Sequence, residues 1–374
     1  MPFMGRGDSQ MNKFGRRFSF STFGESHGSA IGCLIDGVPA GIKLDMEFIQ
    51  GELDKRRPGL NKFATARKES DKVEILSGIF EGFSTGTPIE LIIYNKDQKS
   101  RDYDNVKEIF RPGHADFTYY KKYGIRDYRG GGRSSARETA ARVAAGAVAK
   151  LILNELDIDV KSGVCEVGGI EGGELDFSYP PKSPIYALDR SKDKLWQDKI
   201  LEAKNLHNSV GGVIHVKVLN PPIGLGEPIY YKLDAVLADA MMSINGAKAV
   251  EIGEGVKAAK TLGSQNNDQI AKEGFLSNNS GGILGGISNG EDIDVKVYFK
   301  PTPSIFMEQK TVDKNGVQRD FSLKGRHDPC IAVRGSVVAE AMAAVVIVDM
   351  LLLNMSSKIQ NIKKVYSHTK LNHN

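Results

Sequence analysis

Cysteine is scarce in this 374-residue sequence, which contains only Cys33, Cys165 and Cys330. Three isolated cysteines without Cys-x-x-Cys spacing argue against a disulfide framework and a cysteine zinc site, so we expect no metal. Long apolar runs are also missing, because the longest, from Ala341 to Val348, is far shorter than the roughly 18 residues of a membrane-spanning helix. No charged segment leads into an apolar stretch and a cleavage site, so we expect a cytoplasmic protein with no membrane partner.

A large excess of one charge is absent as well. The 50 Lys and Arg residues nearly balance the 46 Asp and Glu residues, which gives a formal net charge of +4. No basic run with interleaved aromatic residues occurs, so we expect small anions rather than a nucleic acid as ligands. Neither a Walker motif nor G-x-G-x-x-G is present, and no nucleotide-binding βαβ unit is expected. Glycine, by contrast, is abundant at 41 residues, which predicts many tight turns.

The stretch from Arg111 to Leu153 contains the densest group of polar side chains. His114 lies there among charged residues, namely Arg111, Asp116, Lys121, Lys122, Arg126, Asp127 and Arg129. Three glycines at 130–132 then lead through Arg133, Ser134 and Ser135 into an alanine-rich run. Ser135 followed by Glu138 matches a capping box, and the apolar spacing beyond it predicts a helix with a small-residue face.

A glycine-rich turn at a helix N-terminus can receive a phosphate or carboxylate, because it offers unpaired N–H groups and the positive end of the helix dipole. Arg133 and Arg137 are four residues apart and would reinforce such an anion site. The alternative is a loop cap whose arginines pair only with Glu138 and Asp127. The neighbouring His114 favours a ligand site.

A second histidine, His27, lies within Gly24-Glu25-Ser26-His27-Gly28. Glycines on both sides would let Ser26 and His27 approach a ligand closely. A lone histidine is more often structural, but the presence of His114 favours a shared site. The motif is not G-x-S-x-G, so we do not expect a serine hydrolase.

The spacing of apolar residues and of glycine and proline predicts the other elements. Strands are expected at 18–22, 30–38, 73–76, 88–94, 211–219 and 293–300, and helices at 45–53, 189–204, 234–245 and 337–353. Residues 277–289 and 307–323 are expected to be loops. These strands and helices indicate an α+β fold. We divide the chain into an extension at 1–10, expected to be disordered, a single catalytic domain at 11–356 and a polar basic tail at 357–374.

Four motifs together resemble the chorismate synthase family: GESHG at the start, RPGHAD with GGGRSSARET in the middle, KPTPS at 300–304 and GRHDPC at 325–330. The resemblance runs in order over nearly the whole chain. It implies a layered sandwich of two mostly antiparallel sheets covered by helices on their outer faces, with long glycine-rich loops at the active site, in a homotetramer. The implied reaction is an anti 1,4-elimination that converts 5-enolpyruvylshikimate 3-phosphate to chorismate and phosphate, the last step of the shikimate pathway, with reduced FMN but no net redox change.

The resemblance also implies residue roles. The catalytic residues would be His27 near the flavin, His114 near the leaving phosphate, and Ser26 with Asp328 as a proton relay. Arg56, Lys62, Arg111 and Arg137 would bind the substrate, although Lys62 stands where the family has an arginine and lacks the planar guanidinium fork. FMN would be held by Arg133, Ser134, Ser135, Asn245, Gly246, Gly285, Lys300, Pro301, Thr302, Pro303, Ser304 and Arg326.

Two alternatives remain open. An FMN-dependent oxidoreductase would share the flavin site but turn over a nicotinamide. NADPH is expected here only if this chain or a separate flavin reductase reduces the flavin. A noncatalytic anion-binding or RNA-binding protein would account for the arginines and glycines but not for the two histidines.

Overall fold

The protein is described by a computed structural model. It covers residues 11–59, 63, 69–97, 106–322 and 327–367. The extension at 1–10 lies outside these residues, as do Lys62 and Arg326. Most predicted strands and helices are present, and the fold is α+β.

The N-terminal half contributes a four-stranded antiparallel sheet. Its order is β1 (Ser19–Gly24), β2 (Ala30–Asp36), β6 (Ile89–Tyr94) and β3 (Val73–Ile75). Alternate residues of β6 are buried, as expected for a sheet with one face against the core. Ser19 pairs with Asp36 and Gly24 with Ile31, so β1 ends in the glycine that begins the GESHG segment.

A second antiparallel sheet has five strands. Its order is β10 (Ala247–Ile252), β15 (Ile293–Phe299), β9 (Gly212–Leu219), β7 (Asp159–Val167) and β8 (Ile170–Glu171). The inward residues of β9 and β15 are almost all valine, isoleucine or phenylalanine, which favour strands and pack well on a pleated surface.

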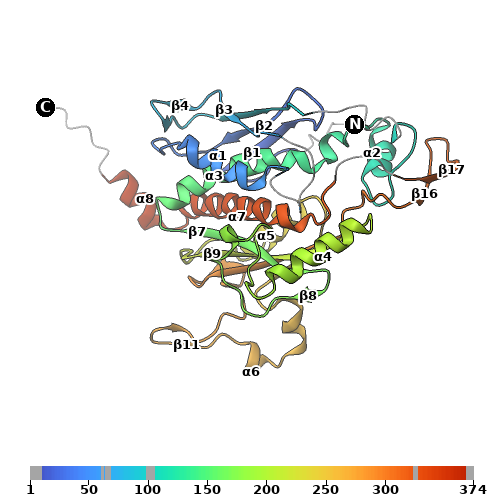
Figure 1. Ribbon diagram of the computed structural model, residues 1–374. Coiled ribbons are helices and arrows are strands. Elements are labelled where there is room, and N and C mark those ends of the chain that lie inside the picture. The colour runs from blue at the N-terminus through green and yellow to red at the C-terminus, as the bar shows by residue number, and fades with distance from the viewer. Residues whose placement is uncertain (1–10, 60–62, 64–68, 98–105, 323–326, 368–374) are drawn as a thin grey trace, which may run out of the picture.

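Three helices lie between the two sheets (Figure 1): α1 (Met46–Arg56), α3 (Thr139–Asn154) and α7 (Ala332–Asn354). Helix α3 contacts β2 and β6 of the first sheet, whereas α7 contacts β7 and β9 of the second. The expectation that helices cover the sheets from outside is therefore wrong for these helices. The reason is that α3 and α7 are apolar on nearly all sides, and a helix of that kind is buried on all sides.

Helix α7 is long and apolar enough to cross a membrane by length and composition, and 78 % of its most apolar part is buried inside the protein. A core helix packed between two sheets has the same properties. Apolar spacing predicts only its later part, 337–353, because Arg334 interrupts the apolar pattern.

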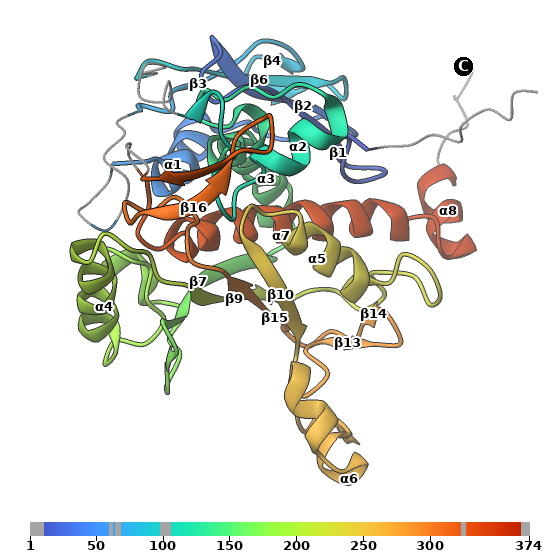
Figure 2. The same cartoon turned by 90° about the vertical axis from the view of Figure 1, so that its right-hand side faces the viewer.

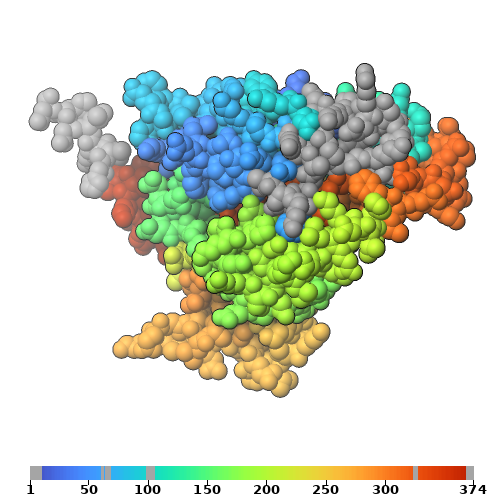
Figure 3. Space-filling view, in the orientation of Figure 1, coloured from blue at the N-terminus to red at the C-terminus, as the bar shows by residue number. Residues whose placement is uncertain are grey.

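The remaining elements surround these layers. They include α2 (Asp116–Tyr123), α4 (Asp193–Asn205), α5 (Leu233–Met242), α6 (Gly263–Asn266) and α8 (Ile359–Tyr366). Short hairpins join β4 (Ile79–Phe80) to β5 (Phe83–Ser84), β11 (Ile270–Ala271) to β12 (Gly274–Phe275) and β13 (Ile283–Leu284) to β14 (Ile287–Ser288). The segment with α6, β11 and β12 projects from the body of the molecule (Figures 2 and 3).

Two segments expected to be irregular contain regular structure. Within 307–323, β16 (Gln309–Val312) and β17 (Gln318–Phe321) pair as a hairpin, which packs Phe321 against Val106. The 277–289 segment contains the β13–β14 hairpin, and α8 forms within the tail. Glycine in 277–289 and polar residues in 307–323 and the tail leave no clear apolar periodicity, so the spacing did not predict these three elements.

Helices α3 and α7 run side by side and begin at the same end of the molecule (Figure 1). A glycine permits their close approach. A Cβ atom at Gly146 would lie 2.4 Å from the Cβ of Ala341 and 2.7 Å from its carbonyl oxygen. This contact brings the N-terminal ends of both helices to one site.

We predict that Gly146→Ala lowers the free energy of unfolding by about 1–3 kcal/mol, because the added methyl group forces two packed helices apart. Gly51→Ala is the matched control, since Gly51 is exposed on α1 with nothing within 4 Å of its Cβ position. That change should stabilise by about 0.5–1 kcal/mol. Urea titrations of both variants measure the difference, and equal effects would contradict close packing at Gly146.

Candidate active site

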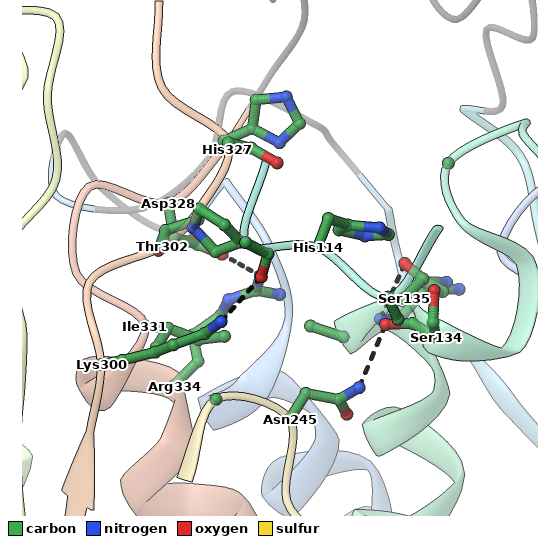
Figure 4. A pocket seen from close by; sticks show the side chains of 18 of the residues that line it. His114, Ser134, Ser135, Asn245, Lys300, Thr302, His327, Asp328, Ile331 and Arg334 are labelled. Carbon is green, nitrogen blue, oxygen red and sulfur yellow. Dashed lines mark hydrogen bonds and ion pairs between the residues drawn. The ribbon is translucent and has the colours of Figure 1, made fainter. Parts of the chain in front are cut away.

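A cavity of about 290 Å³ lies where α3 and α7 begin (Figure 4). Sequence motifs that are far apart in the chain converge on it. Of the predicted site residues, those lining it are Ser26, Arg56, Arg111, His114, Ser134, Ser135, Arg137, Asn245, Gly246, Lys300, Pro301, Thr302, Pro303, Ser304 and Asp328. The structure thus brings together most of the residues singled out from the sequence.

The glycine turn before α3 lies between the two predicted histidines. Gly130, Gly131 and Gly132 have φ values of 64°, 85° and 53°, a region that favours glycine. A Cβ atom at Gly130 would lie 2.3 Å from the His27 ring, and one at Gly131 would lie 3.1 Å from Cε1 of His114. Two of the glycines are therefore required by contact as well as by conformation.

The predicted capping box forms only in part. The chain passes through short 3₁₀ turns at Gly132–Ser134 and Ala136–Glu138 before α3 begins. Ser135 Oγ accepts a hydrogen bond from the backbone N–H of Arg137 at 3.3 Å. The Glu138 carboxylate instead accepts from Arg142 Nε at 3.0 Å and from Thr22 Oγ1 at 2.9 Å. A partner elsewhere in the fold therefore competes for Glu138.

Three predicted residues lie away from the cavity lining. Arg133 donates to the carbonyl oxygens of Gly24 at 2.8 Å and Thr22 at 3.1 Å, and lines an adjoining hollow. Gly285 lies in the turn between β13 and β14. His27 is buried behind Gly130. The sequence placed these three residues near the site, but the spacing of residues along the chain does not show which way each side chain points. Lys62 and Arg326 lie outside the described residues.

The cavity carries a strong excess of positive charge. Among the described residues, six cationic side chains line it, namely Arg56, Arg111, Arg137, Lys248, Lys300 and Arg334, against the single carboxylate of Asp328. Asp328 accepts a hydrogen bond from Arg334. Burial, and then the charge on Arg334, lowers the pKa of Arg56 to about 9. An anionic ligand would relieve this repulsion.

His114 belongs to a charged group at the edge of the cavity. Its Nδ1 lies 3.1 Å from Asp116 Oδ1, and Asp116 also accepts from Arg111 Nε at 2.7 Å and Nη2 at 3.0 Å. Burial lowers the pKa of His114, an effect that Asp116 opposes and Arg111 strengthens. The hydrogen bonds from Arg111 and the close approach of His114 outweigh burial and lower the pKa of Asp116. The carboxylate is therefore charged and the imidazole is mainly neutral near pH 7.

The segment 300–304 forms another wall. Lys300 Nζ donates to the carbonyl oxygen of Gly113 at 2.7 Å, which connects this wall to the segment that carries His114. Burial, followed by the charge of Lys248, lowers the pKa of Lys300. The prolines fix an extended backbone on either side of Thr302.

Sequence analysis missed three polar residues of the cavity: Lys248, His327 and Arg334. Burial, and then the charge of Arg111, lowers the pKa of His327 to about 4. A signal for two of them was present, because His327 lies within GRHDPC and Arg334 precedes an apolar run much as Arg137 does. Lys248 follows Asn245-Gly246 by two residues and has no motif of its own.

Several buried polar atoms around the cavity have no hydrogen-bond partner within the part of the chain that is described. They are Arg137 Nη2, Asn245 Oδ1, Thr302 Oγ1, His327 Nε2 and Arg334 Nε. Such atoms are rare in folded proteins unless a ligand or water completes them. Most of them can donate to an anion. Among the described residues, no group of histidine, cysteine or carboxylate side chains could hold a metal ion.

We predict that inorganic phosphate raises the melting temperature of the protein, because it binds only the folded state. Arg334→Gln should weaken phosphate binding about 10-fold, the effect of losing one charge-assisted hydrogen bond of roughly 1.5 kcal/mol. Arg334→Lys should recover part of the loss. Arg319→Gln is the control, because this half-exposed arginine pairs with Asp313 away from the cavity. Equal phosphate affinities in all four proteins would rule out an anion site at Arg334.

Comparisons with known proteins identify the family to which the chain belongs. The family model described as chorismate synthase matches residues 18–352. The chorismate synthase of a Nitratiruptor species is 68% identical over 95% of this chain and 100% of that protein, and that of Campylobacter fetus subsp. fetus is 60% identical over 96% and 100%. A solved structure titled "Crystal Structure of Chorismate Synthase" has a TM-score of 0.73 at 34% identity, covering 94% of this chain and 97% of that one. The chain therefore belongs to the chorismate synthase family, the flavin-using lyases that convert 5-enolpyruvylshikimate 3-phosphate to chorismate and phosphate.

Proposed function

We propose that the cavity at the start of α3 and α7 is where this chain eliminates phosphate from 5-enolpyruvylshikimate 3-phosphate, with reduced FMN as its cofactor. The observation that supports this most directly is that, within the described part of the chain, six cations and one carboxylate converge on one cavity. The substrate carries two carboxylates and a phosphate, so fixed cations can both orient it and stabilise the departing phosphate.

Arg56, Arg111 and Arg137 are the proposed substrate-binding arginines. Lys62 joins them by resemblance, because it stands where the family has an arginine. Arg111 is held by two hydrogen bonds from its guanidinium group to Asp116, so it is preorganised before the substrate arrives. Arg137 keeps Nη2 without a partner among the described residues, which suits a direct bond to a substrate oxygen. Preorganised donors need little rearrangement during the reaction.

His114 is proposed to act beside the leaving phosphate. A neutral imidazole next to the cations can donate a hydrogen bond to the phosphate oxygens, and once protonated it can donate a proton as charge develops on them. Ser26 and Asp328 both line the cavity, and we assign them to transfer of the proton removed in the elimination. His27, behind Gly130, is assigned by resemblance to keep the reduced flavin in its monoanionic form.

The cavity residues also fit a bound flavin. Asn245 Oδ1 and Thr302 Oγ1 are buried without a partner among the described residues, and Lys300 suits the FMN phosphate. With Ser134, Ser135, Gly246, Pro301, Pro303 and Ser304 they form the proposed FMN set. Arg133, Gly285 and Arg326 belong to it by resemblance. Reduced FMN, once bound, would supply electron density to the breaking C–O bond and would not be consumed.

The wider assignments follow the same proposal. A single catalytic domain would span 11–356, with glycine-rich loops around the active site, and the enzyme would work as a cytoplasmic homotetramer. NADPH would enter only through reduction of the flavin, by this chain or by a separate reductase.

We predict that His27→Ala and His114→Ala each lower turnover by roughly 10- to 1000-fold, which spans a typical general acid–base contribution and somewhat less. Both variants should fold, because neither imidazole belongs to the apolar core. His215→Ala is the control, since His215 pairs with Asp294 across two strands at 2.8 Å and lies outside the cavity. Turnover at the wild-type level in both folded histidine variants would remove these residues from the mechanism.

We predict that one equivalent of reduced FMN, kept free of oxygen, supports many turnovers. Substrate and product differ only by phosphate and a proton, so no electrons leave the system. Phosphate release and the flavin spectrum, recorded together, provide the measurement. Oxidation of one flavin per product would instead indicate an oxidoreductase.

A further inference from the structure

Two residues that do not line the cavity hold the predicted substrate arginines. Asp71 is fully buried and lies between them. Arg56 Nη1 is 3.4 Å from Asp71 Oδ2, and Arg137 Nη1 donates to Asp71 Oδ1. A single carboxylate therefore serves two buried guanidinium groups.

The backbone at Asp71 is fixed in an uncommon conformation. Its φ is 46°, in the left-handed region that aspartate and asparagine tolerate better than most residues. Gln50 of α1 stabilises this turn, because its Nε2 donates to the Asp71 carbonyl oxygen at 3.2 Å and its Oε1 accepts from the Val73 N–H at 3.1 Å. The turn thus delivers a carboxylate into the core at one defined point.

Asn95 holds the other side of Arg137. Its Oδ1 accepts from Arg137 Nε at 3.0 Å. Its Nδ2 donates to the carbonyl oxygens of Gly28 at 2.8 Å and Glu25 at 3.1 Å. The two carbonyls flank Ser26 and His27, so one amide side chain connects Arg137 to the segment that carries both residues.

Together these bonds leave Arg137 little freedom. Nε is held by Asn95 and Nη1 by Asp71, while Nη2 is the nitrogen without a partner among the described residues. Since Arg137 lines the cavity and its two holders do not, the arrangement points the unpaired nitrogen toward a ligand. Arg56 is fixed similarly, by Asp71 on Nη1, by Thr139 Oγ1 on Nε at 3.1 Å and by the Ala136 carbonyl on Nη2.

We infer that Asp71 and Asn95 are positioning residues for the elimination. Asp71 orients Arg56 and Arg137 as a pair and balances their charge. Asn95 sets the distance between Arg137 and the segment carrying Ser26 and His27. Neither residue touches the substrate: Asp71 acts through Arg56 and Arg137, and Asn95 acts through Arg137. The inference rests on the proposed substrate-binding role of Arg137.

The test is a double-mutant cycle on kcat/KM, measured with reduced FMN in the absence of oxygen. We expect Asn95→Ala and Asp71→Asn each to lower kcat/KM about 10- to 100-fold, the range for a displaced catalytic group. Asparagine suits the left-handed backbone, so Asp71→Asn preserves the turn. In an Arg137→Ala background, Asn95→Ala should have almost no further effect, because its partner is gone.

Asp193→Asn is the matched control. Asp193 is buried and accepts from Tyr179 Oη at 2.9 Å and Ser183 Oγ at 3.0 Å, away from the cavity. This variant should lose stability but keep wild-type kcat/KM in the folded protein. If Asp71→Asn does not fold, Asp71→Glu keeps the charge while displacing the carboxylate by one methylene, and the same loss of kcat/KM is expected.

The outcomes distinguish an error in the proposed substrate site from an error in the positioning inference. If Arg137→Ala alone retains wild-type kcat/KM, the proposed substrate site is wrong. If Arg137→Ala is impaired while folded Asn95→Ala and the folded Asp71 variant are not, only the positioning inference fails. Additive losses in the Asn95/Arg137 cycle would also overturn it, since they would mean that Asn95 acts independently of Arg137.

Discussion

Burial of several guanidinium groups side by side is the interaction on which this structure depends. Arg56, Arg111 and Arg137 are each at most 5% exposed, and like charges at this depth repel one another strongly. Three carboxylates make the cluster possible, because Asp71, Asp116 and Asp328 each pair with at least one arginine. Removing one partner of such a pair typically costs several kcal/mol. The protein thus keeps a cationic cavity whose remaining charge favours an anion.

The layered fold places this cluster. The two helices that begin at the cavity, α3 and α7, must lie close together for Arg137 and Arg334 to reach the same space. Gly146 against Ala341 permits that approach, and the two sheets bury the helices from both sides. The apolar packing of α3 and α7 therefore stabilises the polar cavity at their N-terminal ends. The free energy gained in the core offsets the repulsion between the buried charges there.

The sequence predicted the elements and the motifs better than their orientation. Apolar spacing identified α3, and the motifs named most residues of the cavity. The order of the layers was not readable, because an all-round apolar helix does not show which sheet covers it. The bonds of Arg133 to β1 carbonyls and the place of His27 behind Gly130 depend on contacts between distant segments. Contacts between distant segments also bring Arg334 and Lys248 to the cavity, and apolar spacing alone did not predict them as site residues.

The surroundings of His114 have a physical consequence for substrate binding. Burial and the charges of Arg111 and Arg126 lower the pKa of its imidazole, whereas Asp116 raises it. With the leaving phosphate beside His114, as proposed, a second negative charge would favour the imidazolium form. The pKa of His114 would then rise when the substrate binds and stay high while the phosphate gains charge. In that proposal, a residue that is mainly neutral before binding would become a better proton donor when the leaving group needs one.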